Sequence, residues 1–261
     1  MSELFGKANS SFQKVIRNRS YLRLSLVLAM ASLAPVALFA LNGSLPPGSN
    51  FNLSYWELAI PTGSTPTIIS NSQLENGYTN SSYFFTNSSD GTMAMKDPGS
   101  NCTKFSGSSY CRTEFHEVDP SSGQETSWSP SGTSKLNATL KVTVVGGGIV
   151  IGQVFLDDSA HKPLAELDYK SSGDIYLNVE QTETGGSTTP YYVGNVSVDT
   201  SFSYELSYTN NALSVVLNNG NRQYVTVPSA LQGIKAFFKA GNYGQSSEAS
   251  DVHFSILTIK H

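Results

Sequence analysis

The sequence predicts an all-β chain: a single β-sandwich jelly roll of two curved antiparallel sheets, with a groove across one of them. Short runs rich in β-branched and aromatic residues recur along the chain, separated by turn signals about every ten residues. Charged residues make up only 14% of the 261 residues, and Ser, Thr, Asn and Gly are abundant. Helical periodicity is almost absent, which argues against a helical cytosolic enzyme.

The expected strands follow from this pattern. The run 51–60 ends at Pro61, and 135–145 alternates apolar and polar residues before three glycines. Runs 83–86 and 92–95 form a hairpin across 87–91, and runs 202–209 and 212–217 flank a tight turn at Asn210-Asn211. Brief helices are expected only near 70–74 and 229–232. The remaining expected strands are 111–118, 149–156, 164–169, 174–180, 191–198, 222–227, 234–243 and 252–260.

The N-terminus is typical of an export signal. Five basic residues precede an apolar run from Leu24 to Leu41 that Pro35 interrupts. We expect residues 1–44 to be a signal peptide or an uncleaved signal anchor, and residues 45–261 to be one domain outside the cell. Only that segment, if uncleaved, would contact a membrane. The net charge of -4 argues against nucleic acid as a partner.

Two weaker features agree with an extracellular location. Cys102 and Cys111, the only cysteines, bracket a short Gly/Ser loop and are expected to form a disulfide in an oxidising compartment. Asn-x-Ser/Thr sequons, which mark surface loops of glycoproteins, occur at Asn52, Asn80, Asn87, Asn101, Asn137 and Asn195.

Three of the expected strands carry polar side chains on a shared face, since alternate residues of a strand point the same way. The strand 234–243 places Lys239, Gly241, Tyr243 and, beyond its end, Gln245 on one face, where Gly241 would let a ligand approach the backbone. Alone, each such strand is better explained as a half-buried strand, and an Arg-Glu pair can be structural. Together they indicate a cationic, hydrogen-bonding groove. The other two faces are Arg112, Glu114 and His116, opposite Thr113, Phe115 and Glu117, and the pair Gln153 and Phe155.

These stretches resemble the alginate lyases of polysaccharide lyase family 7 and their jelly-roll relatives, including glucuronan lyases. The resemblance spans nearly the whole domain and rests on three motifs in the family's order, with weaker support from 51–58 and 162–164. It implies a concanavalin-like jelly roll that cleaves 1,4-linked polyuronates by β-elimination. The three motifs are Arg112-Thr113-Glu114-Phe115-His116, Gln153-Val154-Phe155 and Phe237 to Gln245.

The resemblance also implies roles for individual residues. Arg112 and Gln153, with His116 as a further candidate, would hold the carboxylate of the uronate. Tyr243 would protonate the leaving oxygen, and Lys239 would lower the pKa of that tyrosine or bind a neighbouring carboxylate. The other residues expected to contact or support substrate are Glu114, Gln245, Asn242 and Lys162. No metal and no cofactor is implied; the expected partner is an anionic polysaccharide, alginate or glucuronan, bound by a monomer.

Two positions depart from the family pattern. Phe155 stands where the family has a histidine, and His116 stands where it has a second arginine. Either His116 supplies an imidazole from the neighbouring strand, or the site works without one, or the chain no longer catalyses. With Tyr243 as the sole base and acid, we expect a preference for mannuronate- or glucuronate-type linkages, whose C5 proton and C4 oxygen leave from the same side.

Two other functions stay open at this point. A non-catalytic carbohydrate-binding module or lectin could keep the same fold and groove. A sandwich glycoside hydrolase would need two carboxylates around the scissile bond. Glu117-Val118-Asp119 resembles the start of such a motif, but Pro120 follows and the final glutamate is absent.

Overall fold

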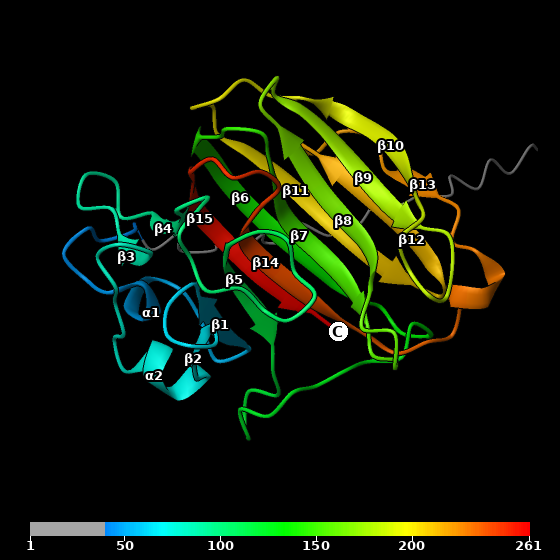
Figure 1. The fold of residues 1–261 in the computed structure, drawn as a ribbon, viewed down its shortest axis with the longest axis horizontal. Coiled ribbons are helices and arrows are strands. Elements are labelled where there is room, and N and C mark those ends of the chain that lie inside the picture. The colour runs from blue at the N-terminus through cyan, green and yellow to red at the C-terminus, as the bar shows by residue number, and fades with distance from the viewer. Residues whose placement is uncertain (1–39) are drawn as a thin grey trace, which may run out of the picture. The chain divides into compact units, whose positions relative to one another are not determined.

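The computed structural model describes residues 40–261, which form two antiparallel β-sheets stacked on each other (Figure 1). The predicted β-sandwich is therefore confirmed. The predicted export segment lies almost entirely outside the described residues and stays a prediction, as does the domain boundary near residue 45. Within residues 40–261, no helix is long and apolar enough to cross a membrane.

One sheet has eight strands in the order β10-β9-β8-β7-β14-β5-β1-β2. Its central strands β7, β14 and β5 carry the three motifs, so the motifs lie side by side although they are far apart in the sequence. The strands are β1 (Trp56–Ile60), β2 (Thr67–Ile69), β5 (Arg112–Glu117), β7 (Gly148–Leu156), β8 (Pro163–Lys170), β9 (Asp174–Glu180), β10 (Thr188–Asn195) and β14 (Ala236–Gly244).

The second sheet has seven strands in the order β13-β12-β11-β6-β15-β4-β3. These are β3 (Phe84–Thr86), β4 (Met93–Asp97), β6 (Lys135–Val144), β11 (Phe202–Thr209), β12 (Ala212–Leu217), β13 (Gln223–Val225) and β15 (Ser250–Lys260). The helical elements are short: α1 (Pro47–Asn50), α2 (Asn71–Glu75) and η1 (Ser229–Leu231).

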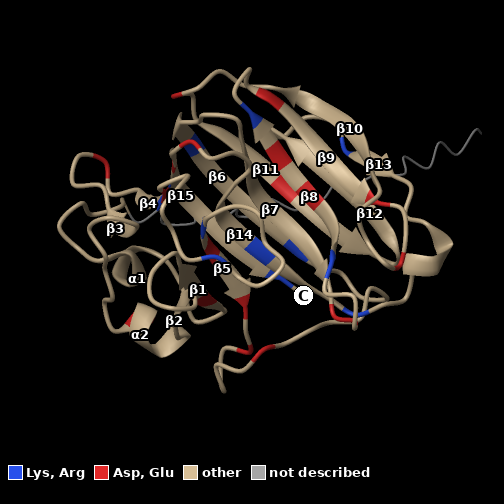
Figure 2. Ribbon diagram, viewed as in Figure 1, with Lys and Arg blue, Asp and Glu red and all other residues tan. Residues whose placement is uncertain are grey.

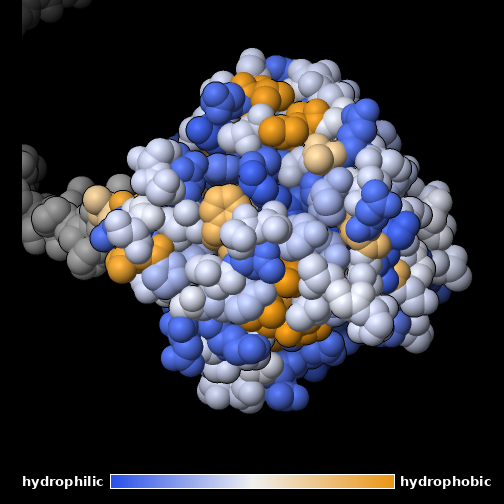
Figure 3. Space-filling view, turned by 60° about the vertical axis from the view of Figure 1, so that its left-hand side comes forward, coloured by the Kyte–Doolittle hydropathy of each residue, from blue (hydrophilic) through white to orange (hydrophobic). Residues whose placement is uncertain are grey.

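The core lies between the two sheets and follows the alternation read from the sequence. Along β6, the apolar residues from Leu136 to Val142 are buried and their polar neighbours are half-buried. Strand β7 is buried almost throughout, because it lies at the centre of its sheet between the core and the groove loops. The large apolar side chains that remain exposed belong to several different strands and loops. Figure 3 shows a few separate apolar groups among polar residues on one face of the molecule.

Most predicted turns are confirmed. Asn210 and Asn211 both have positive φ, as the tight turn between β11 and β12 requires. The hairpin of β3 and β4 also forms. The strand expected over 51–60 was predicted too long, because it begins only at Trp56. The Trp56 N–H donates to the Leu53 carbonyl in a turn that follows α1.

Strand β14 contains an irregularity that the alternation did not predict. Its pairing with β7 shifts between Ala240 and Tyr243. Gly241 has a φ of +150°, and a Cβ at this position would lie 2.6 Å from the Thr113 carbonyl oxygen and 2.8 Å from the Glu114 Cα. The glycine is thus required by the close approach of β5. The expectation that it admits a ligand to the backbone was wrong.

Candidate active site

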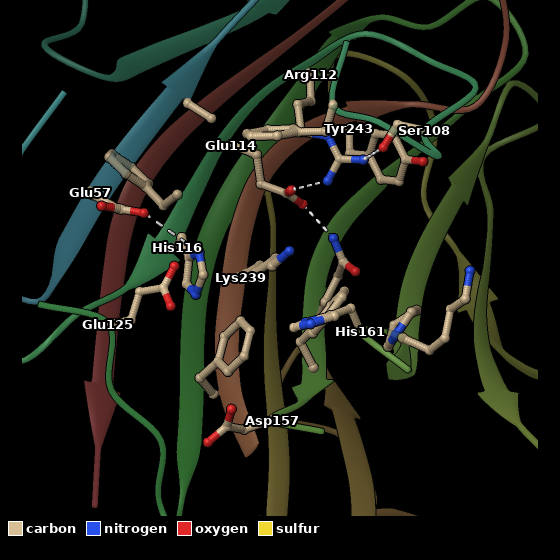
Figure 4. A pocket seen from close by; sticks show the side chains of 18 of the residues that line it. Glu57, Ser108, Arg112, Glu114, His116, Glu125, Asp157, His161, Lys239 and Tyr243 are labelled. Carbon is tan, nitrogen blue, oxygen red and sulfur yellow. Dashed lines mark hydrogen bonds and ion pairs between the residues drawn. The ribbon is translucent and has the colours of Figure 1, made fainter. Parts of the chain in front are cut away.

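A pocket of about 760 Å³ lies over the face of the eight-stranded sheet that points away from the core. Strands β5, β7 and β14 form its floor, and the segments 105–108, 125–127 and 157–163 form its rim (Figure 4). Every residue that was expected to be catalytic lines this pocket: Tyr243, Gln153, Arg112 and His116.

The Glu114 carboxylate joins two of these residues. Arg112 donates from Nη1 to one oxygen of Glu114 at 2.8 Å, and Gln153 donates from Nε2 to the other at 2.5 Å. The Glu114 side chain is almost completely buried. Charge-assisted hydrogen bonds of this kind are short and directional. Glu114 therefore holds the guanidinium and the amide at fixed positions beside each other (Figure 4).

Arg112 also lies against the candidate acid and base. Its guanidinium carbon is 3.6 Å from the centre of the Tyr243 ring, and Nη2 donates to Ser108 Oγ at 2.8 Å. Burial raises the pKa of the Tyr243 hydroxyl, and the Arg112 charge opposes this rise. Arg112 is thus the cation that contacts the Tyr243 ring and favours the tyrosinate, which leaves Lys239 its other expected role, the binding of a neighbouring carboxylate.

Lys239 lies instead over an aromatic floor. Its Nζ is 3.8 Å from the centre of the Phe155 ring, and Phe155 stacks on Phe237 with 5.2 Å between the ring centres. The Phe237 ring stacks in turn on His116 at 4.3 Å. Burial lowers the pKa of Lys239 to about 8, so the ammonium remains largely charged at neutral pH. It can bind a substrate carboxylate from this position.

His116 is a neutral imidazole at neutral pH. Burial and the nearby Lys239 charge lower its pKa to about 3. Its Nδ1 lies 3.6 Å from Glu57 Oε1, which is therefore a contact between a carboxylate and an uncharged ring. Together with Glu125, the possible ligand atoms of these side chains lie within 4.8 Å of one another. This is the group among the described residues whose geometry could hold a metal ion.

The sequence predicted a cationic groove, but the pocket as a whole is not cationic, so this prediction was wrong. Five carboxylates and three cationic side chains line it, and Figure 2 shows acidic and basic positions side by side on these strands. The cations Arg112 and Lys239 lie at the centre. Burial, with repulsion from Glu114 and Asp168, raises the pKa of Glu166 to about 7, so this carboxyl is partly uncharged near neutral pH.

Only some of the residues expected to bind substrate line the pocket. Lys162 lines the rim of the pocket, whereas Gln245 does not line it. Asn242 is fully buried on the core side of β14, donates to the Met95 carbonyl and accepts from the Ser250 hydroxyl. This is the face opposite Lys239 and Tyr243, as the alternation along β14 requires, so the expectation that Asn242 contacts substrate was wrong.

Sequence reasoning missed several lining residues. Glu166 lies directly across from Gln153 in the pairing of β8 with β7, and Glu57 lies across from His116 in the pairing of β1 with β5. These positions follow from strand register, which the sequence alone does not give. Ser108 had a signal, because it lies between the two cysteines and just before the Arg112 strand. The predicted disulfide between Cys102 and Cys111 is present.

Glu117, the carboxylate that a sandwich glycoside hydrolase would need at its active site, does not face the pocket. Glu117 is buried behind the sheet, where its Oε2 accepts hydrogen bonds from the Trp128 indole and the Phe238 amide, and its Oε1 contacts His261. It does not line the pocket. The Glu117-Val118-Asp119 stretch therefore does not provide a hydrolase acid and base here.

Comparisons with known proteins agree with this arrangement. A family model described as alginate lyase matches residues 51–261. A curated alginate lyase from Klebsiella pneumoniae is 28% identical over 77% of this chain and 84% of its own length.

Solved structures are also similar. The family 7 alginate lyase A1-II′, a substituted form in complex with substrate (GGMG), superposes with a TM-score of 0.75 at 27% identity over 83% of this chain and 96% of its own. An alginate lyase from Pseudomonas aeruginosa superposes with a TM-score of 0.73 at 27% identity over 80% of this chain and 99% of its own.

Proposed function

The chain belongs to the alginate lyase family, and we propose that its pocket cleaves 1,4-linked polyuronate by β-elimination with Tyr243 as base and acid. One observation carries the assignment of roles. Tyr243, the paired donors Arg112 and Gln153, and the half-buried Lys239 face one pocket, next to the carboxylate that orients the donors. A carbohydrate-binding module has no need of a tyrosine stacked beneath a guanidinium, and this alternative is not favoured.

The chemistry needs three functions in one place. The C5 proton of a uronate is weakly acidic, so its carboxylate must be neutralised as charge develops on it. Arg112 and Gln153 supply hydrogen-bond donors for that carboxylate. A base must accept the C5 proton, and an acid must protonate the C4 oxygen as the C4–O bond breaks. The Tyr243 oxygen can accept the first proton and return one to the leaving oxygen.

This use of a single residue restricts the substrate. The C5 proton and the C4 oxygen lie on the same side in mannuronate and glucuronate, and on opposite sides in guluronate. Phe155 occupies the position of the family's histidine and cannot move a proton. We therefore propose that the chain prefers mannuronate- or glucuronate-type linkages over polyguluronate.

An assay of unsaturated product, read as absorbance near 235 nm, tests this on polymannuronate, glucuronan and polyguluronate. We expect turnover on at least one of the first two and at least about tenfold less on the third, a preference of about 1.4 kcal/mol in transition-state binding. Equal or faster cleavage of polyguluronate would contradict the preference. Absence of product on all three, with binding retained, would contradict the lyase function of this chain.

Restoring the histidine should relax the preference. Phe155→His would place an imidazole under Lys239 in the same pocket as Tyr243, where it could accept the proton of a guluronate unit. We expect the ratio of polyguluronate to polymannuronate cleavage to rise several-fold relative to wild type. Phe155→Leu, which removes the ring without adding a base, is the matched control. A similar rise in both variants would show that pocket shape, and not proton transfer, limits the substrate range.

We further propose that the domain acts outside the cell as a monomer. The export-like N-terminus and the disulfide support the location. The scatter of exposed apolar side chains over the described surface supports the monomer, since stable dimers bury contiguous apolar patches.

A further inference from the structure

The loop between the two cysteines forms one wall of the pocket. Its residues Phe105 to Ser108 line the pocket, and the Cys102–Cys111 bond closes the loop at its base. Thr103 anchors the start of the loop through its N–H to the Pro61 carbonyl and its hydroxyl to the Gly63 carbonyl. At the other end, the Cys111 carbonyl accepts from the Gly244 amide of β14. The loop is thus tied to the strand that carries Tyr243.

Ser108 lies beside the two central groups of the site. Its Oγ accepts a hydrogen bond from Arg112 Nη2 at 2.8 Å, and the same guanidinium lies 3.6 Å from the centre of the Tyr243 ring (Figure 4). The Ser108 side chain also lowers the pKa of Tyr243. A guanidinium can only donate, so the contact with Arg112 leaves the single hydroxyl proton of Ser108 free. That proton can be donated to the tyrosine oxygen, which is a strong acceptor when it is ionised.

We propose that Ser108 is a positioning residue that stabilises the ionised form of Tyr243, and that the Cys102–Cys111 disulfide holds it in place. This rests on the proposed lyase function, because the tyrosine must be ionised to accept the C5 proton. In this role Ser108 takes no part in the proton transfer itself. It acts by making the tyrosinate available at a lower pH.

Charged groups on several strands also act on Tyr243. Arg112 and Glu114 face it from β5 and Glu166 from β8, and Lys239 is the charged residue on β14 itself. After burial, which raises the pKa of Tyr243, Arg112 lowers it and the two glutamates raise it further. Ser108 differs from all of these because its hydroxyl carries no charge. Its removal therefore leaves the net charge of the site unchanged.

The test is the pH profile of kcat for Ser108→Ala, Ser108→Thr and Ser109→Ala. Ser109 is an exposed neighbour that does not line the pocket, which makes it the matched control. For Ser108→Ala we expect kcat to fall about tenfold at neutral pH and the acidic limb to move up by about one pH unit, since a charge-assisted hydrogen bond is lost. KM should change less than about twofold on the same reasoning. Ser108→Thr should restore the wild-type profile.

Several outcomes would overturn the proposal. A loss of kcat that is equal at every pH, or one shared by Ser109→Ala, would indicate a merely structural role. In a Cys102→Ser and Cys111→Ser double variant, the acidic limb of the kcat profile should move up in the same way. An unshifted limb would show that the disulfide is not needed to hold Ser108 in place.

A measurement without substrate separates this inference from the lyase assignment. The ionisation of Tyr243 can be followed by ultraviolet phenolate absorbance, as the difference between each variant and its Tyr243→Phe counterpart. Ser108→Ala should raise the midpoint of this titration by about one pH unit. An unchanged midpoint would overturn the role of Ser108 even if the chain were found to cleave no polyuronate.

Discussion

Tyr243→Phe should reduce the rate of β-elimination by about 10³-fold or more, because the phenol oxygen is both base and acid in the proposed reaction. Phenylalanine keeps the ring on which the Arg112 guanidinium rests, so the fold and the carboxylate-binding donors should persist. Product formation near 235 nm measures the loss. Binding of an oligouronate, measured by calorimetry, should weaken less than about tenfold.

Tyr224→Phe is the matched control, since Tyr224 is largely exposed on the other sheet. It should leave both rate and binding unchanged. If Tyr243→Phe kept more than about a tenth of the wild-type rate, another group would have to move the proton. Lys239, whose pKa is lowered to about 8 by burial, would then be the next residue to substitute.

Gly241→Ala should lower the free energy of unfolding by about 3 kcal/mol, through backbone strain and overpacking. The new methyl group would meet the Thr113 carbonyl and the Glu114 Cα, which are backbone atoms of β5 and cannot rotate away. Because β5 also carries Arg112 and Glu114, its displacement should reduce activity as well. Thermal unfolding would show the loss as a fall in Tm of roughly 10 °C.

Gly233→Ala separates strain from crowding. Gly233 has a φ of +78°, and a Cβ there would have no atom within 4 Å. This control should lose only about 1 kcal/mol, the cost of a left-handed conformation in an L-residue. Equal losses in the two variants would mean that crowding against β5 contributes nothing.

The faces of individual strands could be predicted because alternation is a local property of the backbone. Arg112, Glu114 and His116 point into the pocket, and Phe115 points into the core, as the period of two requires. The tight turn at Asn210-Asn211 was predictable for a similar reason, because few residues tolerate positive φ. Asn242 obeys the same rule, since it lies on the core side with Phe238 and Ala240, and what failed was the substrate-binding role expected of it.

The amino-acid sequence was enough to predict the β-sandwich, the order of the three motifs and the family to which the chain belongs. The partner of each polar group became known only from the folded chain. The fold placed Arg112 on Tyr243, Lys239 on Phe155, and Glu166 and Ser108 beside them. The physical reason is that strand register and loop packing join residues that are distant in the chain. Burial at those contacts then raises the pKa of Tyr243 and Glu166 and lowers that of Lys239.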